Sequence, residues 1–137
     1  MNRQTLAQRR AVHALVRIET HRKSGADNYK NYVGYVKAQP ATILMNGLGQ
    51  AVATLLSKAK GKLDKPHGLL YADLQDWLCG TDEAAPFRNA NGGDDKLMKS
   101  ILNGGERDYF RAQTEALAYI VWLKKFANAY LERGGPK

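Results

Sequence analysis

The sequence holds a single cysteine and no long apolar run. Cys79 has no second thiol to pair with, which excludes an intramolecular disulfide framework and suits a reducing compartment. No apolar stretch approaches the ~20 residues that a membrane-spanning helix needs. No charged start is followed by the apolar run of a signal peptide. We therefore expect a soluble, cytoplasmic protein that has no membrane partner.

Alternating strand patterns, internal repeats and low-complexity segments are also missing. Apolar residues recur instead at the spacing of helix faces through most of the chain. A chain of 137 residues has the size of one domain and can bury a sizeable core. The sequence predicts an all-α fold, with residues 1–137 forming a compact single-domain bundle of about six helices around a long apolar C-terminal helix. We expect a surface loop at 80–93 and a flexible tail at 134–137.

Turn-forming residues place the helix boundaries. Pro40 is predicted to end one helix and open the next, because proline has no backbone N–H to lose in a first turn. Asn46-Gly47 readily adopts positive φ and is predicted to end that second helix. Asp94-Asp95 is predicted to cap a short helix, and the last helix is predicted to be the longest, surrounded by others. The expected helices cover residues 4–21, 28–39, 40–46, 48–60, 69–78, 96–102 and 107–131.

Acidic residues are scarce in the first half of the chain. Residues 1–62 hold eleven Lys and Arg against only Glu19 and Asp27, which gives +9, whereas the remaining residues sum to −1. All of the excess positive charge therefore lies in the first half. Such a field attracts polyanions, most often nucleic acid, through a salt-sensitive term that does not depend on base sequence.

The first helix carries a basic flank beside its apolar stripe. Arg3, Arg10 and Arg17 recur every seven residues, with His13 and His21 along the same line. A solvated helix face is the commoner explanation of such a run. The alternative interpretation is a ridge that contacts nucleic-acid phosphates.

Two further groups of lysines lie in the following helices. Lys30 and Lys37 share the polar side of the 28–39 helix, whose inward residues include Tyr32. Tyrosines between lysines can stack on exposed bases, although they are more often the edge of a core. Lys58, Lys60 and Lys62 surround Gly61 at a helix C-terminus, where cations complement the helix dipole.

Signals for catalysis and for cofactors are weak. The soft-metal ligands His13, His21, His67 and Cys79 lack any paired spacing, so neither a metal nor a cofactor is expected. Asp73 and Asp76 are predicted on an exposed helix face. No nucleophile has an identifiable base and orienting partner, so no catalytic residue is assigned. A single Gly47-Leu48-Gly49 after a helix is better explained as a turn than as a phosphate loop.

Three separated pieces of the sequence resemble one family, the small helical subunit of the type III-B, or Cmr, CRISPR effector complex. Their order and spacing are similar to those of that family, and together they span residues 29–127. The pieces are Pro40, Ile43, Asn46-Gly47-Leu48, Gln50 and Leu55-Leu56-Ser57-Lys58; then Tyr71, Leu74 and Trp77-Leu78; then Tyr109, Thr114-Glu115-Ala116-Leu117 and Trp122-Leu123-Lys124-Lys125-Phe126-Ala127.

The resemblance implies a non-catalytic, RNA-binding assembly subunit in antiviral defence. Copies of such a subunit stack into a short filament beside the repeated backbone subunit and the large subunit, and they line the groove for guide and target RNA. Phosphate contacts would then be expected from the basic half of the chain. The expected RNA-binding residues are Arg3, Arg10, Arg17, Lys30, Lys37, Lys58, Lys60 and Lys62.

Two other functions remain as alternatives from the residues alone. One is a stand-alone helical DNA-binding regulator, which would need a recognition helix with several polar side chains facing a groove. The 48–60 helix offers few beyond Gln50, Thr54 and Ser57. The other is a small hydrolase with a spatially assembled site that uses His67 or Asp76.

Overall fold

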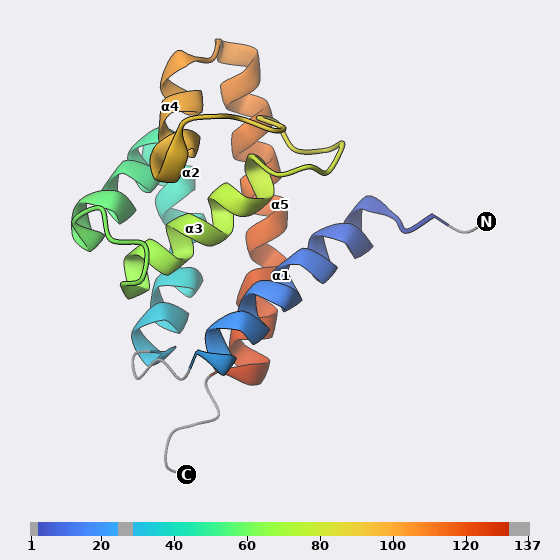
Figure 1. Cartoon of the computed structure of the whole chain (residues 1–137), viewed down its shortest axis with the longest axis vertical. Coiled ribbons are helices and arrows are strands. Elements are labelled where there is room, and N and C mark those ends of the chain that lie inside the picture. Colours follow the sequence, from blue (N-terminus) through green and yellow to red (C-terminus); the bar gives the residue numbers. More distant parts are fainter. Residues whose placement is uncertain (1–2, 25–28, 132–137) are drawn as a thin grey trace.

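The computed structural model describes residues 3–24 and 29–131, and these residues form helices and turns without any strand. The predicted all-α class is confirmed for this part of the chain, whereas the predicted tail at 134–137 and helix start at residue 28 lie outside it. Figure 1 shows the arrangement, with α5 upright and α3 crossing it. The elements are α1 (Leu6–Lys23), α2 (Tyr29–Ala59), α3 (Pro66–Leu78), a 3-10 turn (Gly93–Asp95), α4 (Lys96–Asn103) and α5 (Glu106–Tyr130).

A reciprocal cap starts α1. The Gln8 backbone N–H donates to Thr5 Oγ1 at 3.1 Å, and the Thr5 N–H donates to Gln8 Oε1 at 2.7 Å. This capping box satisfies two backbone donors that the first turn of a helix leaves without partners. The helix start is therefore fixed by local sequence.

Pro40 does not divide α2, and the prediction that one helix ends there is wrong. The proline lies inside an uninterrupted helical segment that runs from Tyr29 to the kink at Gly47. Neither this segment nor the one after the kink is as long as the 25-residue α5, so the prediction that the last helix is the longest is confirmed. Proline removes one N–H from the helix ladder. Tyr32, Val36 and Ile43 lie on both sides of it and are all completely buried, so core packing holds the two segments in one line. Because α2 covers three of the predicted ranges, 28–39, 40–46 and 48–60, the described residues form five α-helices rather than about six.

The predicted break at Asn46-Gly47 is present as a kink within α2. Gly47 has φ 86° and ψ 157°, a backbone conformation that only glycine adopts readily. A Cβ at this position would lie 2.7 Å from Tyr109 Oη of α5. Beyond the kink, the Leu48 N–H donates to Gln113 Oε1 and the Gly49 N–H donates to Tyr109 Oη, at 2.9 and 2.8 Å. Side chains of α5 thus cap the second half of α2.

The helices after the α2–α3 turn begin differently from the prediction. Helix α3 starts at Pro66, earlier than the predicted residue 69. Asp95 precedes α4 without a side-chain capping hydrogen bond, and its carboxylate lies 3.3 Å from Lys99 Nζ instead. Between α3 and α4, the Phe87 N–H donates to the Leu78 carbonyl and the Asn89 N–H to the Gly80 carbonyl, both at 3.0 Å. These bonds tie the connecting segment back to the end of α3.

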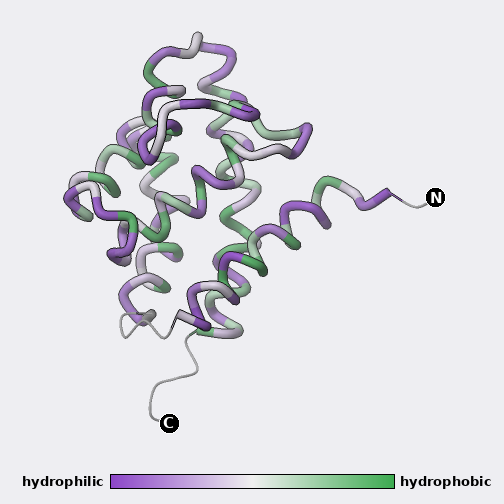
Figure 2. The backbone as a smooth tube through the Cα atoms, viewed as in Figure 1, coloured by the Kyte–Doolittle hydropathy of each residue, from purple (hydrophilic) through white to green (hydrophobic). Residues whose placement is uncertain are grey.

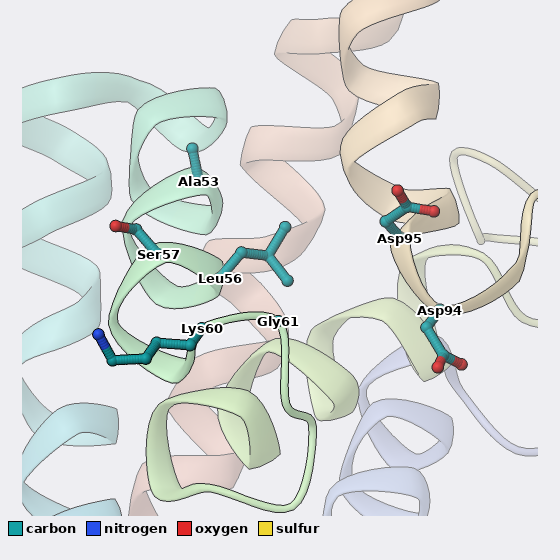
Figure 3. A pocket seen from close by; sticks show the side chains of 7 residues that line it. All are labelled: Ala53, Leu56, Ser57, Lys60, Gly61, Asp94 and Asp95. Carbon is teal, nitrogen blue, oxygen red and sulfur yellow. The ribbon is translucent and has the colours of Figure 1, made fainter.

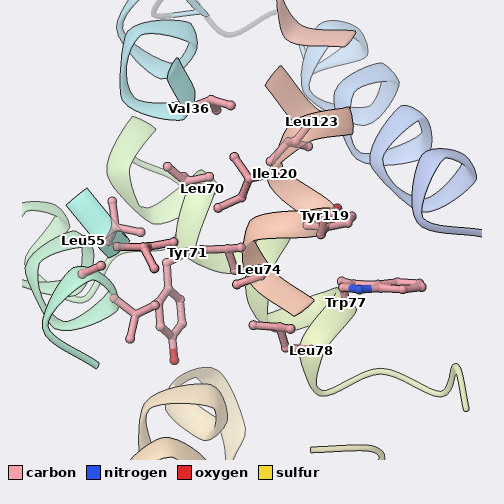
Figure 4. Packing of buried hydrophobic residues seen from close by; sticks show 14 of the residues in the cluster. Val36, Leu55, Leu70, Tyr71, Leu74, Trp77, Leu78, Tyr119, Ile120 and Leu123 are labelled. Atoms are coloured by element: carbon pink, nitrogen blue, oxygen red, sulfur yellow. The ribbon is translucent and has the colours of Figure 1, made fainter. Parts of the chain in front are cut away.

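Helices α2, α3 and α5 supply most of the core. Figure 2 shows that hydrophobic positions alternate with hydrophilic ones along each helix, as expected for amphipathic helices. Figure 4 shows the buried side chains meeting between the three helices. The labelled residues of that cluster are Val36, Leu55, Leu70, Tyr71, Leu74, Trp77, Leu78, Tyr119, Ile120 and Leu123.

Helix α5 contacts each of the other four α-helices, most extensively α1 and α2. The prediction that other helices surround it is nevertheless wrong, because Phe110 and Val121 are 59% and 48% exposed. Helices α1 and α2 flank α5 and leave a strip of its surface uncovered. The described helices include none that is long and apolar enough to cross a membrane.

Candidate nucleic-acid interface

A tight turn after α2 holds three of the predicted RNA-binding lysines at one end of that helix. The Gly61 N–H donates to the Leu56 carbonyl at 3.0 Å, and the Lys62 N–H donates to the Ala59 carbonyl at 3.0 Å. Lys60 and Gly61 have φ values of 54° and 73°, as is common where a helix terminates in left-handed residues. The turn reverses the chain within a few residues and gathers the ammonium groups around the C-terminus of α2.

Lys58, Lys60 and Lys62 are exposed, and within the described part of the chain none of them forms an ion pair with a carboxylate. A hollow of about 610 Å³ adjoins Lys60, lined by α2 and the turn after it on one side and by Asp94 and Asp95 on the other. Figure 3 shows the Lys60 side chain extending away from these two carboxylates. The lysines are therefore available to an anionic partner.

Lys30 and Lys37 lie on the first half of α2 and are both exposed. Their separation of seven residues is close to two helical turns, so they share one side of the helix. Tyr35, between them in sequence, stacks on His67 of α3. The first half of α2 consequently lies beside the start of α3, close to the turn that carries the other lysines.

The Tyr35 and His67 rings form a parallel stack. Their centroids are 3.7 Å apart, their planes are inclined by 17°, and both residues are half-buried. Burial lowers the pKa of His67, and the positive charge of Lys58 lowers it further. His67 is thus kept neutral near Lys58, at the edge of the lysine group.

Arg10 of the predicted arginine flank is bound to α5. Its Nε and Nη2 donate to the two carboxylate oxygens of Glu115 at 2.6 and 2.8 Å, and Trp77 Nε1 donates to Glu115 Oε2 at 2.9 Å. The hydrogen bond with Glu115 raises the pKa of the Arg10 guanidinium. This bidentate arrangement is the strong form of an arginine–carboxylate pair.

Arg17 is bound to α3 through Asp73. Its Nε donates to Asp73 Oδ1 at 2.7 Å, His21 Nε2 lies 2.9 Å from the same oxygen, and the Tyr32 hydroxyl donates to Oδ2. Asp73 has no exposed surface, so its predicted place on an exposed helix face is wrong. A buried carboxylate is tolerated because it accepts several hydrogen bonds and is paired with a cation. Burial, together with the charge of Asp73, raises the pKa of the Tyr32 hydroxyl well above its usual value.

The remaining arginines at the start of the chain contact the segment after α3. Arg3 pairs with Glu83, and Arg9 Nε donates to Asp82 Oδ2 at 2.9 Å. The interpretation of the arginine flank as a solvated helix face is wrong for Arg10 and Arg17, whose side chains are only 20% and 23% exposed. Phosphate contact by these arginines stays a prediction.

His13 lies between α3 and α5, and a hollow of about 340 Å³ adjoins it. Its Nε2 is 2.7 Å from Asp76 Oδ2, and its Nδ1 is 2.7 Å from the Tyr119 hydroxyl. The hydrogen bond with His13 lowers the pKa of Asp76 despite partial burial. Both imidazole nitrogens are occupied, so the group joins three helices.

His67 and Asp76, the residues of the alternative hydrolase, engage different partners in the structure, namely Tyr35 and His13. Over residues 3–24 and 29–131, no three His, Cys, Asp or Glu side chains are grouped so as to hold a metal ion. Burial raises the pKa of Cys79 to about 11, which makes the thiol a poor nucleophile.

Two features of the site were missed by the sequence analysis. Glu115 is a carboxylate on the buried arc of α5 that also carries Ala112 and Tyr119, and this position was a signal for a buried ion pair. The Tyr35–His67 stack joins residues 32 positions apart in the chain, and no local pattern marks such a pair.

A comparison with known families covers almost the whole helical part of the chain. Residues 6–130 match the family described as CRISPR-associated protein (Cas_Cmr5). The match begins at the first residue of α1 and ends at the last residue of α5. The chain therefore belongs to the Cas_Cmr5 family, the small, non-catalytic subunit of the type III-B Cmr CRISPR complex.

Proposed function

We propose that this subunit supplies a basic surface along the groove that receives guide and target RNA in the cytoplasmic Cmr complex. The observation that supports it is the group of exposed lysines at the α2–α3 turn, Lys58, Lys60 and Lys62, which lack carboxylate partners within the described residues. Ammonium groups of this kind neutralise phosphates and release counterions, so they position RNA without reading its sequence. Base pairing with the guide then supplies the selectivity.

The other predicted residues take secondary places in this proposal. Lys30 and Lys37 extend the basic surface along the first half of α2. Arg17 donates to Asp73 from Nε, and we assign to its Nη groups, which form no hydrogen bond within residues 3–24 and 29–131, the contact with a phosphate. Arg3 and Arg10 are paired with Glu83 and Glu115, so in this proposal their phosphate contacts are weaker ones, because the carboxylate offsets part of each positive charge.

The proposal also includes the assembly. Copies of the subunit stack along the complex, beside the repeated backbone subunit and the large subunit. In this arrangement each copy adds one lysine group to a continuous trough. The trough reduces the electrostatic repulsion that a second RNA strand meets beside the guide. The family membership and the exposed lysines support this role in antiviral defence.

The test compares two charge reversals of equal size. Lys58→Glu with Lys62→Glu alters the proposed surface, and Lys124→Glu with Lys125→Glu makes the same change at exposed positions of α5. Lys60 is left unchanged because its φ of 54° would complicate the folding of a variant. Binding to a fluorescent single-stranded RNA, and to a guide-loaded complex, is measured over a range of salt concentrations.

We expect the first variant to bind more weakly and with a flatter salt dependence, since each lost phosphate contact reduces the slope by about 0.7. The α5 variant controls for the change in net charge. Equal effects from both variants, or none from either, would count against the proposed surface. A preference for duplex DNA over single-stranded RNA at matched salt would favour the regulator instead.

A further inference from the structure

The stacked rings of Tyr35 and His67 lie beside the lysines of the proposed RNA surface, and this inference rests on that function. We propose that the pair is a stacking platform for an unpaired base of the bound RNA strand. Lys58 and its neighbours would hold the phosphates, and the two rings would receive the base. The surface would then prefer single-stranded RNA over other polyanions of equal charge.

The position of the pair supports this inference. His67 is the second residue of α3 and follows Lys65-Pro66 directly, while Tyr35 reaches it from α2. Lys58 lies in the last turn of α2, and the connection from there to His67 is short, since α2 ends at Ala59 and α3 begins at Pro66. Both Lys62 and Lys65 are exposed on the connection between the two helices. Aromatic rings beside a positively charged groove are the usual arrangement in proteins that bind single-stranded nucleic acid.

The chemical state of the rings also suits a base. His67 is kept neutral by burial and by Lys58, so at neutral pH it presents an uncharged flat ring. The flat ring of Tyr35 lies against it, and both residues keep part of their surface in solvent. Stacking on such rings tolerates every base because each base has a π-face. This matches a subunit that must accept guides and targets of any sequence.

Other aromatic groups of the described chain are less suited to this role. Trp77 and Tyr119 also stack, at 5.6 Å and 8°, but both are buried. The ring of Tyr130 stacks on Phe126 of the same helix. Its other partner is the guanidinium of Arg22, whose carbon lies 5.8 Å from the centroid of the Tyr130 ring.

Phe110 is 59% exposed, but two acidic and two basic residues lie within one turn of it, so no excess positive charge adjoins this ring; they are Glu106, Arg107, Asp108 and Arg111. Trp122 and Phe126 stack on α5 beside exposed Lys124 and Lys125, but they lie on a different helix from the lysines of the proposed surface. The Tyr35–His67 pair is the one that is joined to those lysines through the α2–α3 connection.

The test separates the base from the phosphates. Affinity of the full chain is measured for oligouridylate and for an abasic ribose-phosphate oligomer of the same length and charge. We expect the wild-type chain to bind oligouridylate about tenfold or more tightly than the abasic oligomer, the range that one stacked base provides. Tyr35→Leu and His67→Leu should remove this preference and leave affinity for the abasic oligomer unchanged. Phe110→Leu, which alters an exposed ring elsewhere, is the matched control.

Each outcome decides between the two proposals. Equal wild-type affinity for both oligomers would overturn the stacking platform and leave the lysine surface intact. A preference that survives in both ring variants would overturn it as well. Absence of binding to either oligomer, also within a guide-loaded complex, would overturn the proposed function and the platform with it. The wild-type comparison needs no variant, so it decides even if a substitution prevents folding.

Discussion

The Arg17 guanidinium donates from Nε to Asp73 Oδ1 at 2.7 Å and ties α1 to a carboxylate of α3 that has no exposed surface. His21 and Tyr32 donate to the same carboxylate, so three helices meet at one buried charge. Helix α1 itself buries few apolar side chains, chiefly Ala14 and Ile18. The attachment of α1 to the bundle therefore depends strongly on this polar contact.

Removal of the Asp73 carboxylate should destabilise the protein severely. Asp73→Ala leaves the donors of Arg17, His21 and Tyr32 without their acceptor, and His21 and Tyr32 are buried. The loss of one partner of a buried ion pair costs about 3–5 kcal/mol. Urea unfolding followed by circular dichroism measures the free energy of unfolding.

Asp76→Ala is the matched control, because it removes a carboxylate one turn away on the same helix. The Asp76 side chain is 58% exposed and, among the described residues, is paired with His13 alone, so its loss should cost no more than about 1 kcal/mol. If the two variants lost equal amounts of unfolding free energy, the hydrogen bonds of Asp73 would not be what holds α1 to the bundle.

The lowered pKa of Asp76 predicts a specific dependence of stability on pH. Hydrogen bonding to His13 makes the folded-state pKa lower than the unfolded value. The pair therefore stabilises the fold fully above the ordinary aspartate pKa of about 3.9, and this contribution is lost as pH falls through the lowered pKa. The positive charges of Arg17 and Lys96 lower the pKa of Asp76 further.

The measurement is the difference in unfolding free energy between wild type and Asp76→Asn across a pH series. The variant keeps the shape of the side chain and lacks its titration, so other carboxylates cancel in the difference. We expect a constant difference of about 0.2–1 kcal/mol near neutral pH that shrinks in acid. A difference that grows as the pH falls would contradict the assignment.

The helical class could be predicted because it depends on local information. Thr5 and Gln8 form their cap within one turn, and glycine at position 47 is needed wherever φ is positive. Pro40 misled the prediction because its local preference to break a helix is outweighed by packing on both sides. That packing involves α3 and α5, which are distant in the sequence.

The roles of charged residues were harder to predict, because they depend on partners in other helices. The spacing of Arg10 and Arg17 correctly indicated one helix flank. Their carboxylate partners, Glu115 and Asp73, lie 105 and 56 positions away. Arginines repeat every seven residues both on a surface that binds phosphates and on a helix face that forms ion pairs with neighbouring helices, so the spacing does not tell the two apart. The lysines after α2 are simpler, because a helix end followed by left-handed residues places them at the surface.

The kink at Gly47 should tolerate no side chain. Gly47→Ala adds a Cβ 2.7 Å from Tyr109 Oη and imposes a backbone conformation that L-residues avoid. We expect a loss of about 2–4 kcal/mol in unfolding free energy, of which the backbone accounts for about 1–3 kcal/mol. Thermal and urea unfolding measure it.

Two comparisons separate the parts of this loss. Gly61→Ala has a φ of 73° but meets no atom within 4 Å, so it reports the backbone part alone. In a Tyr109→Phe background the clashing oxygen is absent, so Gly47→Ala should cost less there than in wild type. Gly47→Ala and Tyr109→Phe form a double-mutant cycle. If their losses of unfolding free energy were fully additive, the clash with Tyr109 would not contribute to the cost of Gly47→Ala.

Cys79 should be nearly inert in the folded protein. The residue is 3% exposed, and burial raises the pKa of its thiol to about 11. At pH 7 only about one molecule in ten thousand would carry the reactive thiolate, and the side chain would still have to become accessible. An aromatic disulfide reagent should therefore label the native chain slowly and the urea-unfolded chain completely, with the released thiolate measured by absorbance. Because labelling requires opening of the end of α3, Asp73→Ala should accelerate it, and the logarithm of the labelling rate should rise in proportion to the lost free energy of unfolding. Rapid stoichiometric labelling of the native wild type would mean that the thiol is accessible and that the packing around Leu78 and Cys79 is not as described.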